Sequence, residues 1–156
     1  YKSEKHFRFC TKGVILIMKV AIVYWSGTGN TEAMASAVAE GAKDAGADAV
    51  MLTAAEFDAS MMDSFEAVAF GCPSMGSEEL EESEFSPMFQ GCETKLKGKK
   101  IALFGSYGWG DGEWMRNWEE VCIGDGASFA CDSVICNEAP DDNAIAACKA
   151  LGKSLA

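Results

Sequence analysis

The stretch Lys19-Val-Ala-Ile-Val-Tyr-Trp-Ser-Gly-Thr-Gly-Asn-Thr31 decides the fold of this chain. Its first part, Lys19–Tyr24, is a short apolar run rich in β-branched residues, which is typical of a buried parallel strand. Its second part, Ser26–Thr31, alternates glycines with hydroxyl and amide residues and predicts a loop. Helical spacing of apolar residues follows from Glu32 to Ala45, and Gly46 suits the end of that helix. The stretch therefore predicts the first strand, loop and helix of an α/β sheet.

Strand-like and helix-like segments alternate along the rest of the chain. Further strands are predicted over Asp48–Leu52, Ala67–Phe70, Lys99–Phe104 and Ser128–Ile135, the last interrupted at Cys131–Ser133. Helices are predicted over Met61–Phe65 (capped by Asp58 or Ser60), from Pro87, over Gly112–Ile123, and over Ala144–Leu151 after caps at Asp141–Asn143. Five strands with intervening helices predict a three-layer, doubly wound α/β fold around a parallel sheet. In such sheets ligands bind beyond the carboxyl ends of the strands, so a site is expected in the loops after strands one, three and four.

The predicted helix Gly112–Ile123 carries two tryptophans. Trp114 and Trp118 share one face with either Val121 or Cys122. We interpret this aromatic face, and Arg116 beside it, as packing.

The composition describes one acidic globular domain. A length of 156 residues favours a single domain, and 49% apolar with 24% charged residues excludes a disordered or collagen-like chain. Asp and Glu number 24 against 13 Lys and Arg, which gives a net charge of −11. Such a surface repels nucleic-acid phosphates and anionic lipid. The charge therefore argues against nucleic-acid or membrane binding and suits a basic protein partner.

The cysteines and the single histidine, His6, argue against a metal site and against His-based catalysis. There are seven cysteines, an odd number, and no C-x-x-C pair occurs. This pattern favours the reduced thiols of a cytoplasmic protein, most of them small buried apolar residues. We therefore expect no metal ligand and no catalytic residue.

Residues 1–17 differ in charge from the rest of the chain. Four cations and one carboxylate give them a net charge of +3, which leaves −14 on the remaining 139 residues. A signal peptide is one interpretation, but Lys19 interrupts the apolar run Val14–Tyr24, and no small-x-small cleavage site follows it. We expect Met18 to be the natural start, residues 1–17 to be a dispensable extension and residues 18–156 to form the domain. A chain that begins at Met18 should then fold and bind its ligand unchanged.

The first loop predicts an anion site without a lysine. Exposed N–H groups at a helix start, together with the helix dipole, favour an anion, and the glycines let the backbone approach it closely. Hydroxyl and amide donors are supplied by Ser26, Thr28, Asn30 and Thr31. A P-loop would need a lysine here, and the dinucleotide fingerprint would need a glycine where Glu32 stands. The loop predicts a phosphate held by neutral donors, and the alternative is a polar turn with a threonine cap.

The second and third loops predict the walls of a flat pocket. They read Cys72-Pro-Ser-Met-Gly-Ser-Glu-Glu79 and Gly105-Ser-Tyr-Gly-Trp-Gly-Asp-Gly112. Trp109 lies among glycines, where it has no helix face to join, so we expect it to stack on a planar group. Met75 would supply a polarizable second wall. The alternative is a tryptophan folded back over a glycine-rich turn.

From Met18 onward the sequence resembles the short-chain flavodoxins of anaerobic bacteria. The segments Tyr24–Thr31, Cys72–Glu79 and Gly105–Gly110 match that family in order and spacing. The resemblance implies strand order 2-1-3-4-5 with non-covalently bound FMN at the point where the order reverses. It also implies that the fifth strand lacks the insertion found in the long-chain subfamily.

The resemblance further implies a cofactor role for three sets of residues. The FMN phosphate would be bound by Ser26, Gly27, Thr28, Gly29, Asn30 and Thr31. The isoalloxazine ring would lie between Met75 on its inner face and Trp109 on its outer face. The second loop would place the backbone of Met75, Gly76 and Ser77 beside N5 and Glu78 at the N3 edge, with Pro73, which donates no hydrogen bond, and Ser74 before them. The third loop would border the ribityl chain and the pyrimidine end with Ser106, Tyr107 and Gly108, and Gly110 would be a further cofactor-binding residue of that loop.

The implied function is that of a low-potential one-electron carrier, not an enzyme, whose FMN shuttles between semiquinone and hydroquinone. A peptide flip at Gly76 would provide a carbonyl for the N5 proton, because only glycine makes that flip cheap. Five of the seven residues in Glu78–Glu84 are Glu, and the three loops hold no Lys or Arg, so the reduced anion would be disfavoured. We expect a monomer that docks basic patches of redox proteins such as ferredoxin-NADP reductase, in salt-sensitive encounters.

Two other functions remain as alternatives at this point. An FMN-dependent NAD(P)H:quinone reductase of the same fold would need a second pocket for nicotinamide, and steady-state NAD(P)H oxidation would distinguish it. A response regulator would need an acidic cluster with a phosphorylatable Asp at the strand ends, and neither occurs here.

Overall fold

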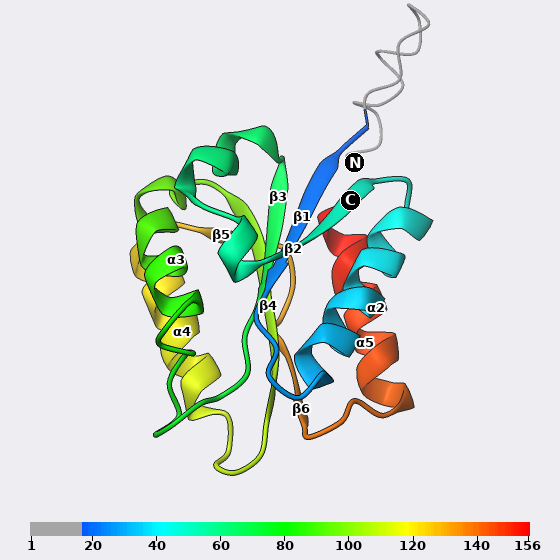
Figure 1. The fold of residues 1–156 in the computed structure, drawn as a ribbon. Helices are drawn as coiled ribbons and strands as arrows, with labels where there is room; N and C mark the ends of the chain where they lie inside the picture. Colours follow the sequence, from blue (N-terminus) through cyan, green and yellow to red (C-terminus); the bar gives the residue numbers. More distant parts are fainter. Residues whose placement is uncertain (1–16) are drawn as a thin grey trace, which may run out of the picture.

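The computed structural model describes residues 17–156 (Figure 1). The predicted dispensable extension, residues 1–17, lies outside the described residues except for Ile17. Strand β1 (Lys19–Tyr24) begins one residue after Met18, where the strand pattern predicts it.

The described residues form alternating strands and helices in the predicted order. After β1 the strands are β2 (Asp48–Thr53), β3 (Ala67–Gly71), β4 (Lys100–Tyr107), β5 (Ser128–Phe129) and β6 (Val134–Asn137). The α-helices are α2 (Asn30–Asp44), α3 (Phe85–Cys92), α4 (Glu113–Gly124) and α5 (Asp142–Leu155). Short 3-10 helices are η1 (Ala54–Glu56), η2 (Ala59–Ser64) and η3 (Glu93–Lys95). Within residues 17–156, no helix has the length and apolar character needed to cross a bilayer.

The strands pair in parallel in the order β2-β1-β3-β4-β5, which confirms the predicted doubly wound topology. The fifth position of the sheet is shared by two short strands. β5 pairs with the start of β4 through Lys100 and Ile101, and β6 pairs with its end from Phe104 to Tyr107. The predicted interruption of the fifth strand at Cys131–Ser133 therefore separates two strands on the same edge of β4. Pairing with β6 also carries β4 to Tyr107, beyond the predicted end at Phe104.

Helices cover both faces of the sheet, with α2 and α5 on one side and α3 and α4 on the other (Figure 1). The backbones of α2 and α5 are in direct contact where the two helices cross. A Cβ atom on Gly41 would lie 2.0 Å from the carbonyl oxygen of Lys149, and one on Gly152 would lie 2.0 Å from that of Val38. The two glycines therefore set how closely this pair of helices packs.

The ends of the helices agree with the residues predicted to cap them, with small differences. Gly46, at φ 97°, follows α2 and donates its N–H to the Lys43 carbonyl, while Ala47 donates to Ala42, an arrangement that closes the helix end. Asp58 caps η2 by accepting the Ser60 N–H at 2.9 Å, which selects it over Ser60. Asp141 caps α5 by accepting the Ala144 N–H at 2.8 Å.

Helix α4 buries Cys122 in its apolar face and exposes Arg116. Cys122 is the buried member of its apolar face with Trp114 and Trp118, whereas Val121 is 43% exposed. The interpretation of Arg116 as packing is wrong. Its side chain is 58% exposed and its guanidinium bonds the carboxylate of Asp111 at 3.0 Å, because the helix turns this position away from the sheet toward the preceding loop.

Candidate cofactor site

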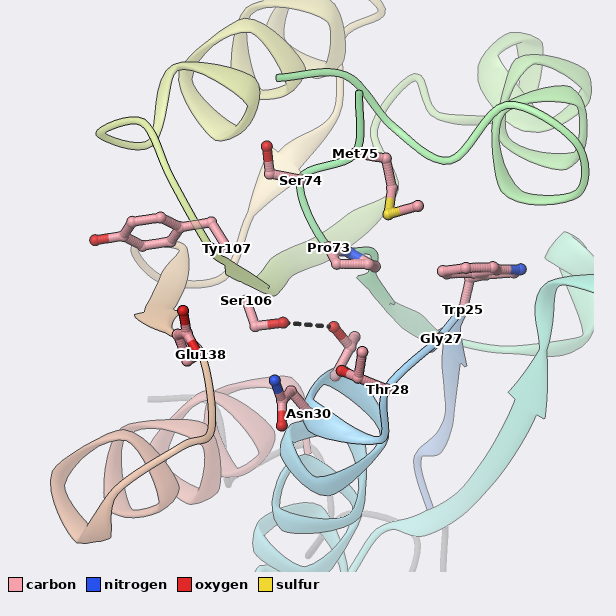
Figure 2. A pocket seen from close by; sticks show the side chains of 12 residues that line it. Trp25, Gly27, Thr28, Asn30, Pro73, Ser74, Met75, Ser106, Tyr107 and Glu138 are labelled. Atoms are coloured by element: carbon pink, nitrogen blue, oxygen red, sulfur yellow. Dashed lines mark hydrogen bonds between the residues drawn. The ribbon is translucent and has the colours of Figure 1, made fainter. Parts of the chain in front are cut away.

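The loops after β1, β3 and β4 meet at the carboxyl edge of the sheet around a cavity of about 280 Å³ (Figure 2). This is the edge at which the alternation of strands and helices predicts a site. The cavity is lined by Trp25, Gly27, Thr28, Asn30, Thr31, Pro73, Ser74, Met75, Ser106, Tyr107, Gly108 and Glu138. In Figure 2, Trp25 and Met75 lie at one end of the cavity, and Tyr107 and Glu138 lie at the other.

The side chain of Ser26 stabilises the first loop through two hydrogen bonds to backbone N–H groups. Its hydroxyl oxygen accepts the N–H groups of Gly29 at 3.1 Å and of Glu32 at 3.2 Å. Gly29 precedes α2 in the left-handed region at φ 99° and provides no side-chain cap. Within the described residues, the N–H groups of Asn30 and Thr31 have no protein acceptor, as is usual for the first turn of a helix. This helix end is therefore open to an anion at the cavity.

The first and third loops are joined through a buried hydroxyl pair. The side-chain oxygens of Thr31 and Ser106 lie 3.1 Å apart, and both residues are almost fully buried. Figure 2 marks this bond with a dashed line from the Ser106 hydroxyl. Thr31 and Ser106 therefore fix the distance between the start of α2 and the end of β4.

The second loop is a tight turn closed by two backbone hydrogen bonds. Met75 and Glu79 exchange N–H···O bonds, each 2.8 Å long, across the three residues between them. Gly76 at φ 54° and Glu78 at φ 57° both lie in the left-handed region. A side chain at Gly76 would meet no atom within 4 Å, so the backbone conformation rather than space favours glycine there.

Glu78 connects the second loop to the third. Its carboxylate accepts the N–H of Glu113, the first residue of α4, at 2.9 Å. Gly110 lies directly against this carboxylate, since a Cβ atom there would be 2.6 Å from the Glu78 carboxyl carbon. The expected contact of Glu78 with the cofactor stays a prediction, and in this structure the residue caps α4.

The two predicted walls of the pocket carry exposed apolar side chains. Trp109 is 64% exposed and Met75 is 38% exposed. At that exposure Trp109 does not fold back over the glycine-rich turn, which removes the alternative considered for it. A large aromatic ring held in solvent by a loop is available to stack on a planar ligand.

The structure brings part of the predicted set together around the cavity. Among the predicted residues, those that line it are Gly27, Thr28, Asn30, Thr31, Pro73, Ser74, Met75, Ser106, Tyr107 and Gly108. The others belong to the same three loops without lining the cavity: Ser26, Gly29, Gly76, Ser77, Glu78, Trp109 and Gly110.

Two lining residues were missed in the sequence. Trp25 directly follows β1, and its indole N–H donates to the carboxylate of Glu84 at 2.9 Å. This bond joins the first loop to the glutamate-rich run Glu78–Glu84, which we call the acidic loop. Glu138 follows β6 and has φ 61°, unusual for a residue other than glycine. Its N–H donates to the carbonyl of Tyr107 at 2.8 Å. Ligands bind beyond the carboxyl ends of parallel strands, and Glu138 directly follows the observed end of β6 at Asn137. The predicted strand ended at Ile135, so Glu138 was not recognised as a residue at a strand end.

One glutamate of the acidic loop is a buried cap. Glu81 is 6% exposed, and its carboxylate accepts the N–H groups of Ser83 at 2.9 Å and of Glu84 and Phe85 at 2.8 Å each. Burial raises the pKa of this carboxyl group, but the bonds from the Ser83 hydroxyl and the three amides outweigh it and hold the pKa below its usual value. Glu81 is therefore not solvated like the exposed glutamates of the Glu78–Glu84 run, and its carboxylate caps the start of α3.

The fold and site define a doubly wound α/β protein whose loops, where the strand order reverses, present open N–H groups, an exposed indole and an exposed thioether. A family profile described as Flavodoxin matches residues 22–151, and the chain belongs to the flavodoxin family. Flavodoxin from Megasphaera elsdenii is 47% identical over 137 residues, which cover 88% of this chain and 98% of that protein. Flavodoxin from Clostridium beijerinckii is 44% identical over 135 residues, which cover 86% and 97%.

Solved structures agree with this assignment. The solution structure of two-electron reduced Megasphaera elsdenii flavodoxin superimposes with a TM-score of 0.81 at 48% identity, covering 87% of this chain and 97% of that one. An archaeal flavodoxin superimposes with a TM-score of 0.77 at 27% identity, covering 88% and 96%. The predicted resemblance to flavodoxins of anaerobic bacteria is confirmed.

The residues present fit the family cofactor, FMN. The open N–H groups at the start of α2 suit its phosphate, and the exposed indole of Trp109 and thioether of Met75 suit its planar ring. Flavodoxins bind FMN and transfer electrons rather than catalyse a reaction on a substrate, so this chain is an FMN-binding electron carrier. The quinone-reductase alternative is not favoured.

Proposed function

We propose that this carrier works at low potential, with its FMN cycling between semiquinone and hydroquinone. The observation that supports the proposal is the charge around the cavity. None of the twelve lining residues is Lys or Arg, and Glu138 is among them. Arg116, near the third loop, is already paired with Asp111. Uncompensated carboxylates raise the energy of an anionic reduced cofactor and lower its reduction potential.

The proposed binding mode assigns each of the three loops one part of FMN. The phosphate is held by Ser26–Thr31, with the N–H groups of Asn30 and Thr31 as its donors from the helix. The ring lies between Met75 and Trp109, with the turn from Gly76 to Glu78 at its edge. The remaining parts of FMN are bordered by Ser106–Gly110 and by Pro73–Ser74. When bound, FMN supplies the electron-accepting ring, and the protein supplies position, exclusion of water and charge.

Gly76 is the position proposed to adjust to the protonation of the cofactor. Its φ of 54° is a conformation that glycine adopts readily, and the lack of a side chain lowers the cost of turning its peptide. A carbonyl that accepts one new hydrogen bond contributes roughly 1 kcal/mol net.

Redox titration of the purified FMN complex tests the proposal. The midpoint of the second one-electron step should lie below that of free FMN. Glu138→Gln should raise it by about 30 mV, which corresponds to roughly a threefold change in the equilibrium constant. Asp44→Asn, at the end of α2 remote from the cavity, removes the same charge and should leave the midpoint nearly unchanged. A midpoint no lower than that of free FMN contradicts the proposal.

We place the protein in the cytoplasm as a monomer that serves oxidoreductases with basic surfaces, such as ferredoxin-NADP reductase. Support for a reducing compartment comes from the described cysteines, which are all free. Burial raises the pKa of the Cys72 and Cys148 thiols to about 12, so these two are inert packing residues.

A further inference from the structure

A second hollow of about 330 Å³ lies between helices α3 and α4, on the face of the sheet opposite α2 and α5. Each helix presents one stripe to it. The α3 side contributes Ser86, Phe89, Gln90 and Glu93, and the α4 side contributes Trp114, Asn117, Trp118 and Val121. Both sets have the spacing i, i+3, i+4, i+7 of a single helix face. One end of the hollow is closed by the acidic loop with Glu78, Glu79, Leu80 and Glu82. We call the hollow lined by the residues of α3, α4 and this loop, twelve in all, the α3–α4 groove.

The floor of the groove is apolar and buried, and one apolar residue on its α4 side is exposed. Phe89, Trp114 and Trp118 are buried beneath it, whereas Val121 is 43% exposed. The indole N–H of Trp118 is buried and has no acceptor within the described residues. An exposed apolar side chain such as Val121, bordered by polar groups, is typical of a protein contact surface.

The rim of the groove is negative, and no cation of the lining balances it. Four of its twelve residues are glutamates, and none is Lys or Arg. Glu79 and Glu82 are exposed and form no ion pair with the described residues. At the other end, burial and the neighbouring Asp125 carboxylate raise the pKa of Glu93, so two acidic groups there face each other without a cation between them.

We propose that the α3–α4 groove docks a basic amphipathic helix of the redox partner, with its apolar side chains on the floor and its Lys or Arg side chains on the glutamates of the rim. Charge complementarity identifies this occupant. Helix α3 has eight residues and is about 12 Å long, which matches roughly two turns of a docked helix.

The groove also lies beside the cofactor cavity. Glu78 and Glu79 belong to the groove and to the turn that Met75 closes, and Met75 lines the cavity. A partner held in the groove is therefore next to the predicted site of the ring. The identity of the occupant rests on the proposed carrier function, whereas the existence of a basic binding groove does not.

The test uses the full-length, FMN-loaded protein labelled with ¹⁵N and a synthetic amphipathic peptide with Leu on one face and Lys flanking it. The peptide should shift the indole N–H signals of Trp114 and Trp118 more than that of Trp109. Glu82→Lys and Val121→Glu, two surface changes, should each weaken binding at least about tenfold. Asp44→Lys, on α2, is the matched charge control and should weaken it less than about threefold. The same variants should slow electron transfer with ferredoxin-NADP reductase in the same order.

Three outcomes overturn the proposal. The first is a peptide that shifts Trp25 and Trp109 but not the groove tryptophans. The second is binding or electron transfer that Val121→Glu leaves unchanged. The third is peptide binding that appears only when the chain begins at Met18, because the basic residues before it would then be the occupant. Each outcome leaves the redox midpoint untouched, so a failure here is distinct from a failure of the proposed low-potential couple.

Discussion

At the scale of single residues, Glu81 shows how one carboxylate can organise a cofactor loop. It is surrounded in the sequence by glutamates that face solvent, yet its own oxygens accept three backbone N–H groups at the start of α3. The N–H of Glu81 in turn donates to the thiol of Cys72, at the start of the second loop, at 3.4 Å. The residue therefore secures both ends of the segment that carries Met75 and Glu78.

Replacing Glu81 by Ala should lower the free energy of unfolding by about 2 kcal/mol at about pH 7, because three amides lose a charged acceptor. The folded state lowers the pKa of this carboxyl group from the usual 4.5. Its contribution is therefore complete above about pH 4.5 and is lost as the pH falls below that value through the lowered pKa. Urea denaturation of the parent and the variant across this range measures both effects.

Glu82→Ala provides the control, since Glu82 is exposed and its carboxylate forms no ion pair with residues 17–156. Its unfolding free energy should stay within about 0.5 kcal/mol of the parent value. A difference between Glu81→Ala and the parent that does not shrink on acidification would contradict the role of the ionised carboxylate.

At the scale of secondary-structure elements, the crossing of α2 and α5 is the tightest contact between helices in the described chain. Gly41→Ala should destabilise the fold by about 2–3 kcal/mol, because the new methyl group meets the Lys149 carbonyl and the two backbones must separate. Thermal or urea denaturation measures the change.

Gly91→Ala is the matched helical control for this prediction. Gly91 lies in α3, and an added Cβ atom would meet nothing within 4 Å. The substitution should stabilise the protein by about 0.5–1 kcal/mol, because it restricts the unfolded chain. Equal changes in the free energy of unfolding for Gly41→Ala and Gly91→Ala would show that backbone flexibility, rather than contact between α2 and α5, determines the effect of Gly41→Ala.

The order of the elements was predictable because each has a local signal. A β-branched run marks β1, a short apolar run marks β3, and glycines mark the loops that follow them. The division of the fifth strand was predictable in outline, since Cys131–Ser133 interrupts its apolar pattern. The end of β6 was not, because Asn137 continues the strand through pairing with Tyr107 of β4 rather than through its own propensity.

At the scale of the whole molecule, a net charge of −11 governs encounters with partners. Electron transfer with ferredoxin-NADP reductase should slow as salt is added, because salt screens the attraction over about 10 Å at 0.1 M. The double variant Glu79→Gln, Glu82→Gln should lose about threefold to tenfold in rate at low salt and depend less on salt. Stopped-flow kinetics measures both.

Asp44→Asn combined with Asp48→Asn removes the same charge far from the acidic loop. Its rate should stay within about twofold of the parent rate at every salt concentration. A rate that is independent of salt would contradict steering by the acidic loop.

The order of strands and helices and the polar, lysine-free first loop could be predicted from the sequence alone, because each depends on residues that are close together in the chain. The anion-binding role of that loop stays a prediction. Resemblance to a family supplied the order of strands in the sheet. Tertiary structure alone decided which side chains meet: Thr31 with Ser106, Glu78 with Glu113, and Trp25 and Glu138 at opposite ends of one cavity. These contacts join residues far apart in the chain, and they exist because the parallel sheet brings the ends of its strands to one edge.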